Sequence, residues 1–281
     1  MNYECLNMGA YNLHIIHTKK FKTITMEVDF RRKLHKDEIT KRNLLKSILL
    51  YSTKEYPSER SLIIQTENLY DLKLISSNMR IGNYSNLSFK IKFLNEKYTE
   101  KGLNLESINF LMEILFNPDI VKNSFKEEYL TKCKRKLEKN IKSLKDNKLK
   151  YALFKLLETT ENMPYSYNSY GNLEELEELD GKGMYEYYKS VIQNDMIDIF
   201  IVGDVDTTEI KETLREHFKA NTFKKICNKV EVEELNINKK VKFVSDNDDV
   251  NQTQLTMLCN IKNITDFERK YTLLVYSELL G

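Results

Sequence analysis

The chain lacks any run of about 18 consecutive apolar residues, the length that a membrane-spanning helix needs. Its first residues, MNYECLNMG, also lack the basic start and the apolar run of a secretory signal peptide. Neither sign of charge dominates, since the formal net charge is +2 although 31% of the residues are charged. We therefore expect no membrane span, no secretory signal and no global field that attracts polyanions.

Cysteine is scarce and scattered. Cys5, Cys133, Cys227 and Cys259 include no C-x-x-C pair, which favours reduced thiols in a cytosolic protein over a disulfide framework or a zinc knuckle. Cys5 has Glu4 beside it and no histidine close in sequence, so it is a weak candidate for a nucleophile. The G-x-S-x-G, P-loop and dinucleotide-binding motifs are also absent.

The histidines do not form a metal-ligand pattern. His14 and His17 are the only close pair, and residues three apart on a strand point to opposite faces, so these rings would not converge. His35 and His217 are isolated. We expect no metal ion and no other cofactor on these side chains.

Hydrophobic patterning predicts pairs of strands with helices between them, which is an α+β arrangement and not a doubly wound parallel sheet. Strands are expected over residues 12–18, 23–32, 72–76, 87–94, 196–202 and 252–259. Helices are expected over residues 36–51, 105–116, 122–159 and 266–280. Ser58 should cap a short helix, and Thr207 or Thr208 a helix that runs to His217. The polar residues 224–240 are expected to form a linker.

Two charged segments suggest helix faces. Residues 122–155 are strongly basic, but aromatic residues do not alternate with the basic ones, so a solvated helix face explains them better than nucleic-acid binding. The acidic run Glu174-Glu175-Leu176-Glu177-Glu178 would begin a helix, where the dipole favours negative charge. The two segments either attract each other or face a partner chain of opposite pattern.

The predicted helix over residues 36–51 contains Asn43-Leu44-Leu45-Lys46-Ser47. This stretch resembles the zinc helix of the insulinase/pitrilysin class of metallopeptidases, whose signature is H-x-x-E-H. Asn43 and Ser47 take the two histidine positions, and Lys46 takes that of the glutamate. An amide, a hydroxyl and an ammonium neither hold zinc nor act as its general base, so the resemblance implies a peptidase fold without peptidase chemistry.

The third zinc ligand of active members is a glutamate on the long helix downstream, which corresponds here to Lys139. Glu138 lies one position away, and a one-residue step turns a helical side chain by about 100°, so it would point elsewhere. All motif residues are therefore absent together, and the resemblance implies no zinc.

Further segments resemble the same family in the expected order along the chain. They are Leu105 through Pro118, Met163-Pro164-Tyr165 followed by Tyr170-Gly171-Asn172, Tyr185-Glu186-Tyr187-Tyr188, Ile199 through Val205, and Gln252-Thr253-Gln254. Met163 stands where the family usually has a histidine.

The resemblance implies one half of a clamshell of the LuxS/metallopeptidase-like kind, with a mixed, largely antiparallel sheet backed by helices. Residues 1–228 would be an inactive N-terminal half, and residues 229–281 a linker and the beginning of a truncated second half. Extended peptides add to an edge strand in active members. The corresponding strand here would be Leu72, Lys73, Leu74, Ile75 and Ser76.

Catalytic and motif-lacking subunits often pair in this family, as in the mitochondrial processing peptidase and its bacterial two-subunit relatives. The resemblance therefore implies a heterodimer with an active H-x-x-E-H homologue, or a homodimer, that holds a peptide or small-protein substrate. Among bacterial pairs, the chain resembles the inactive member associated with elongation-factor-P modification. The alternatives are a standalone peptide-binding or scaffold protein, and an active peptidase that uses unrelated residues.

Overall fold

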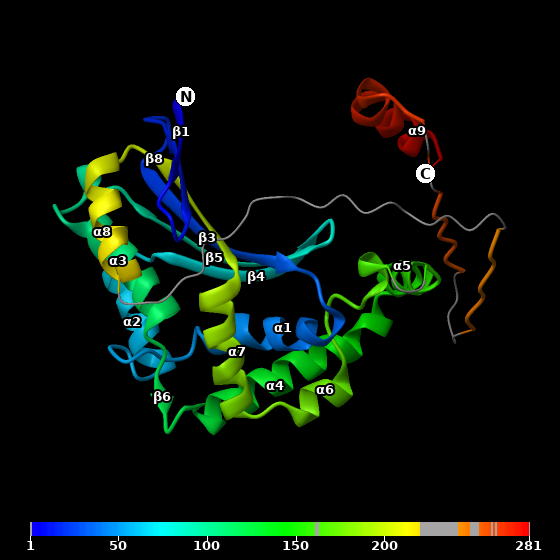
Figure 1. The fold of residues 1–281 in the computed structure, drawn as a ribbon, viewed down its shortest axis with the longest axis horizontal. Helices are drawn as coiled ribbons and strands as arrows, with labels where there is room; N and C mark the ends of the chain where they lie inside the picture. The colour runs from blue at the N-terminus through cyan, green and yellow to red at the C-terminus, as the bar shows by residue number, and fades with distance from the viewer. Residues whose placement is uncertain are drawn as a thin grey trace.

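The computed structural model describes residues 2–160, 163–219, 241–247, 253–259, 261 and 263–280. Its main element is a six-stranded sheet with the strand order β1-β2-β8-β3-β5-β4 (Figure 1). β2 and β8 pair in parallel, and the other neighbouring strands pair antiparallel. The strands are β1 (Asn2–Asn7), β2 (Asn12–His17), β3 (Thr23–Lys33), β4 (Lys73–Ile81), β5 (Tyr84–Leu94) and β8 (Met196–Gly203). The predicted α+β fold with a mixed, largely antiparallel sheet is confirmed.

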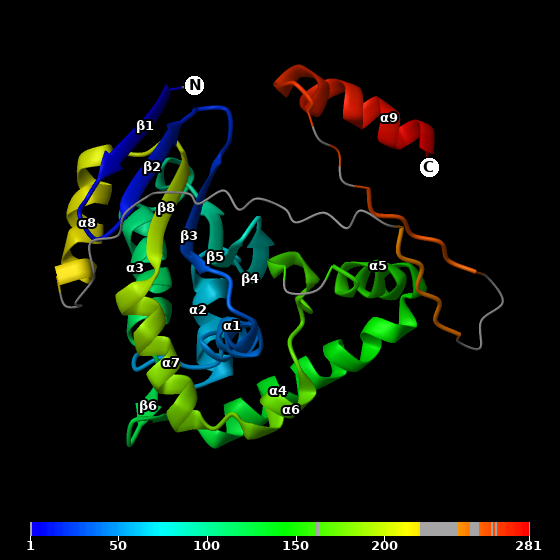
Figure 2. The same cartoon turned by 45° about the vertical axis from the view of Figure 1, so that its right-hand side comes forward.

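Helices back this sheet, and α1, α3 and α7 contact its strands directly (Figure 2). The helices are α1 (Ile39–Ile48), α2 (Glu59–Asn68), α3 (Leu103–Phe116), α4 (Glu127–Lys142), α5 (Lys148–Glu158), α6 (Leu173–Glu178), α7 (Gly181–Asn194), α8 (Thr207–Lys219) and α9 (Leu273–Leu280). No helix in the described ranges has both the length and the apolar character that crossing a bilayer requires.

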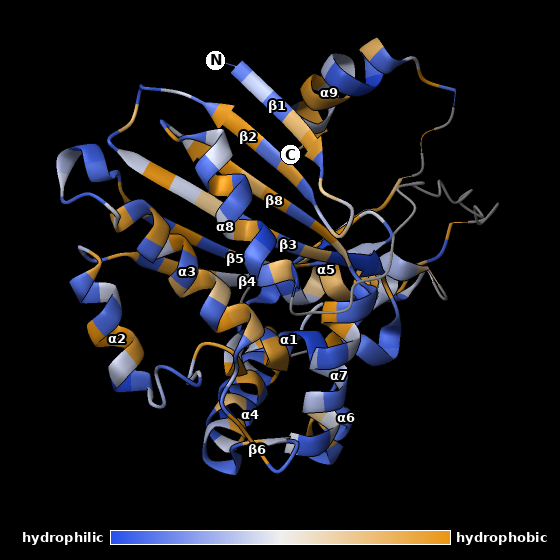
Figure 3. Cartoon of the chain, turned by 60° about the vertical axis from the view of Figure 1, so that its left-hand side comes forward, coloured by the Kyte–Doolittle hydropathy of each residue, from blue (hydrophilic) through white to orange (hydrophobic). Residues whose placement is uncertain are grey.

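The core lies between the sheet and these helices. On β3, Ile24, Met26, Val28 and Phe30 are each at most 1% exposed, whereas the residues between them are only half-buried. This alternation is the period of two that a strand with one covered face requires, and the sequence showed it directly. Hydrophobic stretches accordingly run along the central strands in Figure 3.

The prediction of one helix over residues 122–159 is wrong. Residues 120–125 form a small hairpin of β6 (Ile120–Val121) and β7 (Ser124–Phe125), in which Lys122 and Asn123 have φ of 51° and 59°. α4 follows the hairpin. The helical path is then broken near Asn147, whose side chain accepts a hydrogen bond from the Lys150 backbone N–H (3.0 Å) and starts α5. Asparagine tolerates left-handed backbone and competes for turns and caps, so it breaks an otherwise continuous amphipathic pattern.

One of the two predicted helix caps is correct. Ser58 caps α2, since its Oγ accepts a hydrogen bond from the Ser61 backbone N–H (3.1 Å). α8 is capped by neither Thr207 nor Thr208. Asp206 does so instead, because its Oδ1 accepts a hydrogen bond from the Thr208 backbone N–H (2.8 Å). A carboxylate is a better cap than a threonine hydroxyl.

Two strands differ from the prediction. The strand expected over residues 72–76 excludes Leu72, begins at Lys73 and continues to Ile81, where it turns through Gly82-Asn83 into β5. β1 was not predicted. Its side chains are exposed or half-buried, so its sequence carries no alternation of apolar and polar residues.

The predictions for the C-terminal part have mixed outcomes. The helix expected over 266–280 is present as a π-helical turn, Glu268–Thr272, followed by α9. The strand expected over 252–259 is absent from its described part, 253–259, where Leu255 is 82% exposed. A strand needs a neighbour for its backbone hydrogen bonds, and none pairs with this segment within the described ranges. The linker over 224–240 and the domain boundary at 228 lie outside the described residues.

A buried ion-pair network ties α1 to the sheet. Asp195 lies between α7 and β8 and is 1% exposed. One oxygen accepts a hydrogen bond from Arg42 Nη1 (2.8 Å), and the other from Arg32 Nε on β3. Arg42 is itself fully buried and donates to the Phe30 carbonyl (2.6 Å), while Arg32 pairs with Glu38 (2.9 Å). Each buried charge is therefore compensated by opposite charge or by hydrogen bonds.

We expect Asp195→Asn to lower the free energy of unfolding by about 3–5 kcal/mol, because it leaves the fully buried guanidinium of Arg42 without its carboxylate and Arg32 with Glu38 alone. Urea unfolding measures this loss. The matched control is Asp204→Asn, which removes a carboxylate from Lys97, a residue with a 57% exposed side chain. An exposed pair of this kind contributes at most about 1 kcal/mol. Equal losses in the two variants would contradict the structural role of Asp195.

Candidate functional site

Helix α1 carries the positions that correspond to the zinc motif. Ile39, Leu44, Leu45 and Ile48 bury its apolar face, and the helix contacts both β4 and α4 (Figure 2). The contact with β4 includes a hydrogen bond from Ser76 Oγ to the Lys46 carbonyl (2.9 Å). The motif positions therefore lie beside the edge strand of the sheet.

Asn43 and Ser47, at the two histidine positions, make hydrogen bonds to backbone carbonyls. Asn43 is 4% exposed, and its Nδ2 donates to the carbonyls of Ile39 (3.1 Å) and Ser169 (2.8 Å). Ser47 Oγ donates to the Asn43 carbonyl (3.5 Å). The amide of Asn43 now holds a distant loop against the helix, which is a structural role.

Lys46, at the position of the catalytic glutamate, is half-buried. Burial, and to a lesser extent the positive charge of Lys136 on α4, lowers the pKa of its ammonium group. An ammonium has no lone pair for a metal ion, so Lys46 cannot take part in zinc chemistry while it is protonated.

The position of the third zinc ligand also lacks a side chain that can bind a metal ion. Lys139 lies on α4 and is exposed. Neighbouring Glu138 forms an ion pair with Lys142 on the same helix (2.5 Å). Within the ranges that the structure describes, no group of three or more His, Cys, Asp or Glu side chains is placed to hold a metal ion.

The loop that contains the family-like residues Met163 to Asn172 packs against α1. Gly171 has φ of 98°, and a Cβ there would lie 2.6 Å from Thr40 Oγ1, so only glycine fits. Thr40 Oγ1 also accepts a hydrogen bond from the Asn172 backbone N–H (3.0 Å) and donates to Glu175 (2.5 Å). Thr40 and Arg42, both buried polar residues on α1, were not predicted as part of the site. Their position before the motif was the only available signal.

β4 is the edge strand of the sheet, as predicted for its first residues. Lys73 and Ile75 project away from the helices, and Ile75 is 58% exposed. Leu74 and Ser76 project toward them, and Leu72 precedes the strand and is buried. Peptide binding along residues 72–76 remains a prediction.

The histidines lie in separate surroundings. His14 Nδ1 shares a hydrogen bond with the hydroxyl of Tyr3 (2.8 Å), whereas His17 contacts Thr207 (3.2 Å). The β1–β2 register sets Cys5 opposite His14, a proximity that the sequence did not show. Because the Tyr3 hydroxyl occupies His14 Nδ1, the two residues do not form a direct thiol–imidazole pair through that nitrogen.

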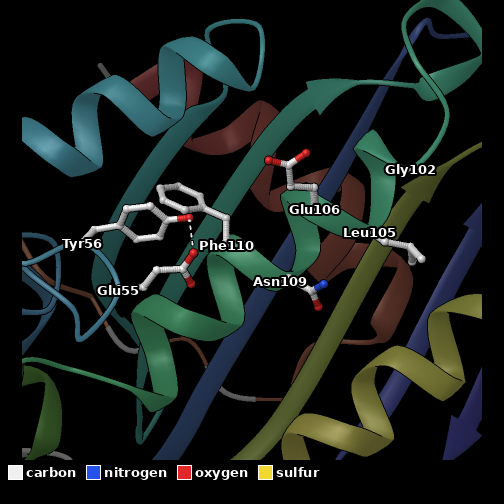
Figure 4. Close-up of a pocket in the computed structure, with 7 residues that line it drawn as sticks. All are labelled: Glu55, Tyr56, Gly102, Leu105, Glu106, Asn109 and Phe110. Carbon is white, nitrogen blue, oxygen red and sulfur yellow. Dashed lines mark hydrogen bonds between the residues drawn. The ribbon is translucent and has the colours of Figure 1, made fainter.

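A separate hollow of about 440 Å³ lies between α3 and the loop after α1. It is lined by Glu55, Tyr56, Gly102, Leu105, Glu106, Asn109 and Phe110 (Figure 4). Burial, together with the neighbouring Glu55 carboxylate, raises the pKa of Tyr56 to about 12. None of the motif positions and no residue of β4 reaches this hollow.

Comparisons with known proteins agree with this geometry. Residues 179–281 match the family model described as peptidase M16 inactive domain. The probable inactive metalloprotease YmfF of Bacillus subtilis (strain 168) is 30% identical over 257 residues, which cover 89% of this chain and 59% of that protein. The chain thus spans about three fifths of this curated relative's length.

Solved structures share the fold. A conserved protein from Enterococcus faecalis V583 superposes with a TM-score of 0.75 and 26% identity, covering 79% of this chain and 53% of that one. The first half of the periplasmic protease PqqL from Escherichia coli gives a TM-score of 0.63 at 13% identity, with coverage of 81% and 48%. The second likeness concerns the fold alone.

We expect the triple variant Asn43→His, Lys46→Glu, Ser47→His to gain no zinc-dependent peptide cleavage, because Lys139 leaves the third ligand absent. Zinc content and chelator-sensitive cleavage are the measurements. The matched variant adds Lys139→Glu, and bound zinc should rise only there. Chelator-sensitive cleavage by the triple variant would show that the site needs no ligand from α4.

Proposed function

We propose that this chain is a member of the M16 (insulinase/pitrilysin-like) family of metallopeptidases that lacks the zinc motif, and that it is the non-catalytic subunit of a peptidase pair. The family model over residues 179–281 and the curated relative support the family assignment predicted from the sequence, and both are described as inactive. The partner would carry the intact H-x-x-E-H motif. Its identity, the substrate and the association with elongation-factor-P modification stay predictions.

One observation carries the proposal: the fold around the motif is complete although its chemistry is absent. α1 contacts both β4 and α4, and at the first ligand position Asn43 Nδ2 donates hydrogen bonds to two backbone carbonyls. Buried polar groups in well-ordered proteins are hydrogen-bonded, so the paired amide of Asn43 indicates that this helix is an ordered part of the fold. Such an ordered helix suits a subunit that forms part of a chamber.

The free edge of β4 supports a role in holding substrate. An extended peptide can add to an open edge and gain main-chain hydrogen bonds with little demand on its sequence. β4 has nine residues, and its outer side has no strand partner within the described part of the chain. The non-catalytic subunit would thereby hold a peptide while the partner cleaves it.

The pair would act in the cytoplasm. Cys5 and Cys259 are exposed free thiols and Cys133 is a buried one, as expected for a reducing compartment. Burial raises the pKa of the Cys133 thiol to about 12, so this side chain is an inert part of the core.

We expect affinity capture of the tagged chain from its source cells to recover a homologue with an intact H-x-x-E-H motif. The captured material should contain zinc and cleave unfolded peptides, and a chelator should abolish the cleavage because the partner's zinc performs it. The chain purified alone is the control and should show neither property. A chain that is recovered as a monomer, but still binds peptides, would instead support a standalone peptide-binding or scaffold protein.

A further inference from the structure

Lys46 is an unusual charge in this protein. Other buried or half-buried charges of the same region are compensated: Arg42 and Arg32 share Asp195, and Lys134 donates to the carbonyls of Glu177 (3.0 Å) and Leu179 (2.7 Å). Within the described ranges, no carboxylate forms an ion pair with Lys46. A half-buried ammonium without an anion is unfavourable for stability, so a role outside folding has to be considered.

The surroundings of Lys46 are positive. Lys136 on α4 lies close enough to lower the pKa of Lys46, and burial is the larger cause. Arg80 projects from β4 on the same side as Ser76, and its hydrogen bond goes to the Pro164 carbonyl (3.4 Å) and not to a carboxylate. Cations from α1 and α4 therefore lie close together at the position of the motif glutamate, and Arg80 lies four residues further along β4 from Ser76.

The position of this cluster relative to β4 determines what could reach it. Ser76, in the middle of β4, donates a hydrogen bond to the Lys46 carbonyl (2.9 Å), so the two elements are in direct contact. A peptide that pairs with the outer edge of β4 would run about 4.8 Å from it, and alternate side chains would point toward α1. A carboxylate on such a side chain, or at the end of the peptide, would lie within reach of a lysine side chain.

We propose that Lys46, with Lys136, forms a carboxylate-binding site that recognises an acidic side chain or the C-terminal carboxylate of a peptide held along β4. The lysine that replaced the catalytic glutamate thus selects substrate. This inference rests on the proposed peptide-holding function of β4.

The test uses fluorescein-labelled decapeptides of alternating serine and valine and the full 281-residue chain. One peptide has a central glutamate and an amidated C-terminus, a second has glutamine and a free C-terminus, and a third has glutamine and an amidated C-terminus. Fluorescence anisotropy at low salt gives the affinities. We expect at least one of the charged peptides to bind about fivefold more tightly than the neutral one, and the preference to shrink as salt is added.

Lys46→Gln should remove this preference and leave the affinity for the neutral peptide unchanged. Lys101→Gln is the matched control, since it removes the same charge from an exposed lysine outside α1, α4 and β4, and it should keep the preference. The first or the second peptide identifies which carboxylate is recognised. Urea unfolding should show that Lys46→Gln is at least as stable as the parent, whereas a structural lysine would lose stability.

Two results would overturn the proposal, and they are distinguishable. Equal binding of all three peptides would leave β4 as a peptide-holding edge and reject the carboxylate site. Absence of binding by every peptide would reject the peptide-holding function, and the carboxylate site with it.

Discussion

Helix α1 is held in place by the buried carboxylate of Asp195, which lies between Arg42 of that helix and Arg32 of β3. Burying three charges is costly, and the cost is offset only because the partners meet with matched hydrogen bonds. The arrangement therefore permits one orientation of α1 against the sheet. Arg42 immediately precedes Asn43, so the same network sets where every motif position lies. The contacts of α1 with β4, α4 and the loop around Gly171 all depend on it.

With α1 held in this way, the side chains at the motif positions have two different roles. Asn43 and Ser47 make hydrogen bonds to backbone carbonyls, so their side chains contribute to the fold. Lys46 keeps a charge that nothing in the described part of the chain compensates. The zinc helix that this stretch resembles holds a metal ion at this place. In this chain the positive charge there comes from side chains, which bind anions and cannot activate water.

The sequence predicted best where the pattern of burial is local. Apolar and polar residues alternate along both β3 and β5. β3 was placed to within one residue, and β5 was found although it begins three residues before the predicted start. The single helix over 122–159 failed because periodicity cannot show a break: the turn at Lys122 and Asn123 and the interruption at Asn147 leave the apolar spacing almost intact. β1 failed for the opposite reason, since a half-exposed edge strand has no pattern to detect. The cap of α8 could be Asp206, Thr207 or Thr208, and the capping free energies of these residue types differ by only fractions of a kcal/mol.

The sequence by itself determined that this is an α+β chain whose zinc ligands and general base are missing, because those conclusions depend on residue identity and spacing along one helix. Tertiary structure alone decided what took their place. Asn43 meets Ser169 across 126 positions and Arg42 meets Asp195 across 153, and such partners cannot be found from local patterns. Among the described residues, the lack of a carboxylate beside Lys46 is likewise a property of how α1 packs against β4 and α4. The sequence shows how many charged side chains a protein has, whereas only the folded structure determines which of them lack a partner of opposite charge.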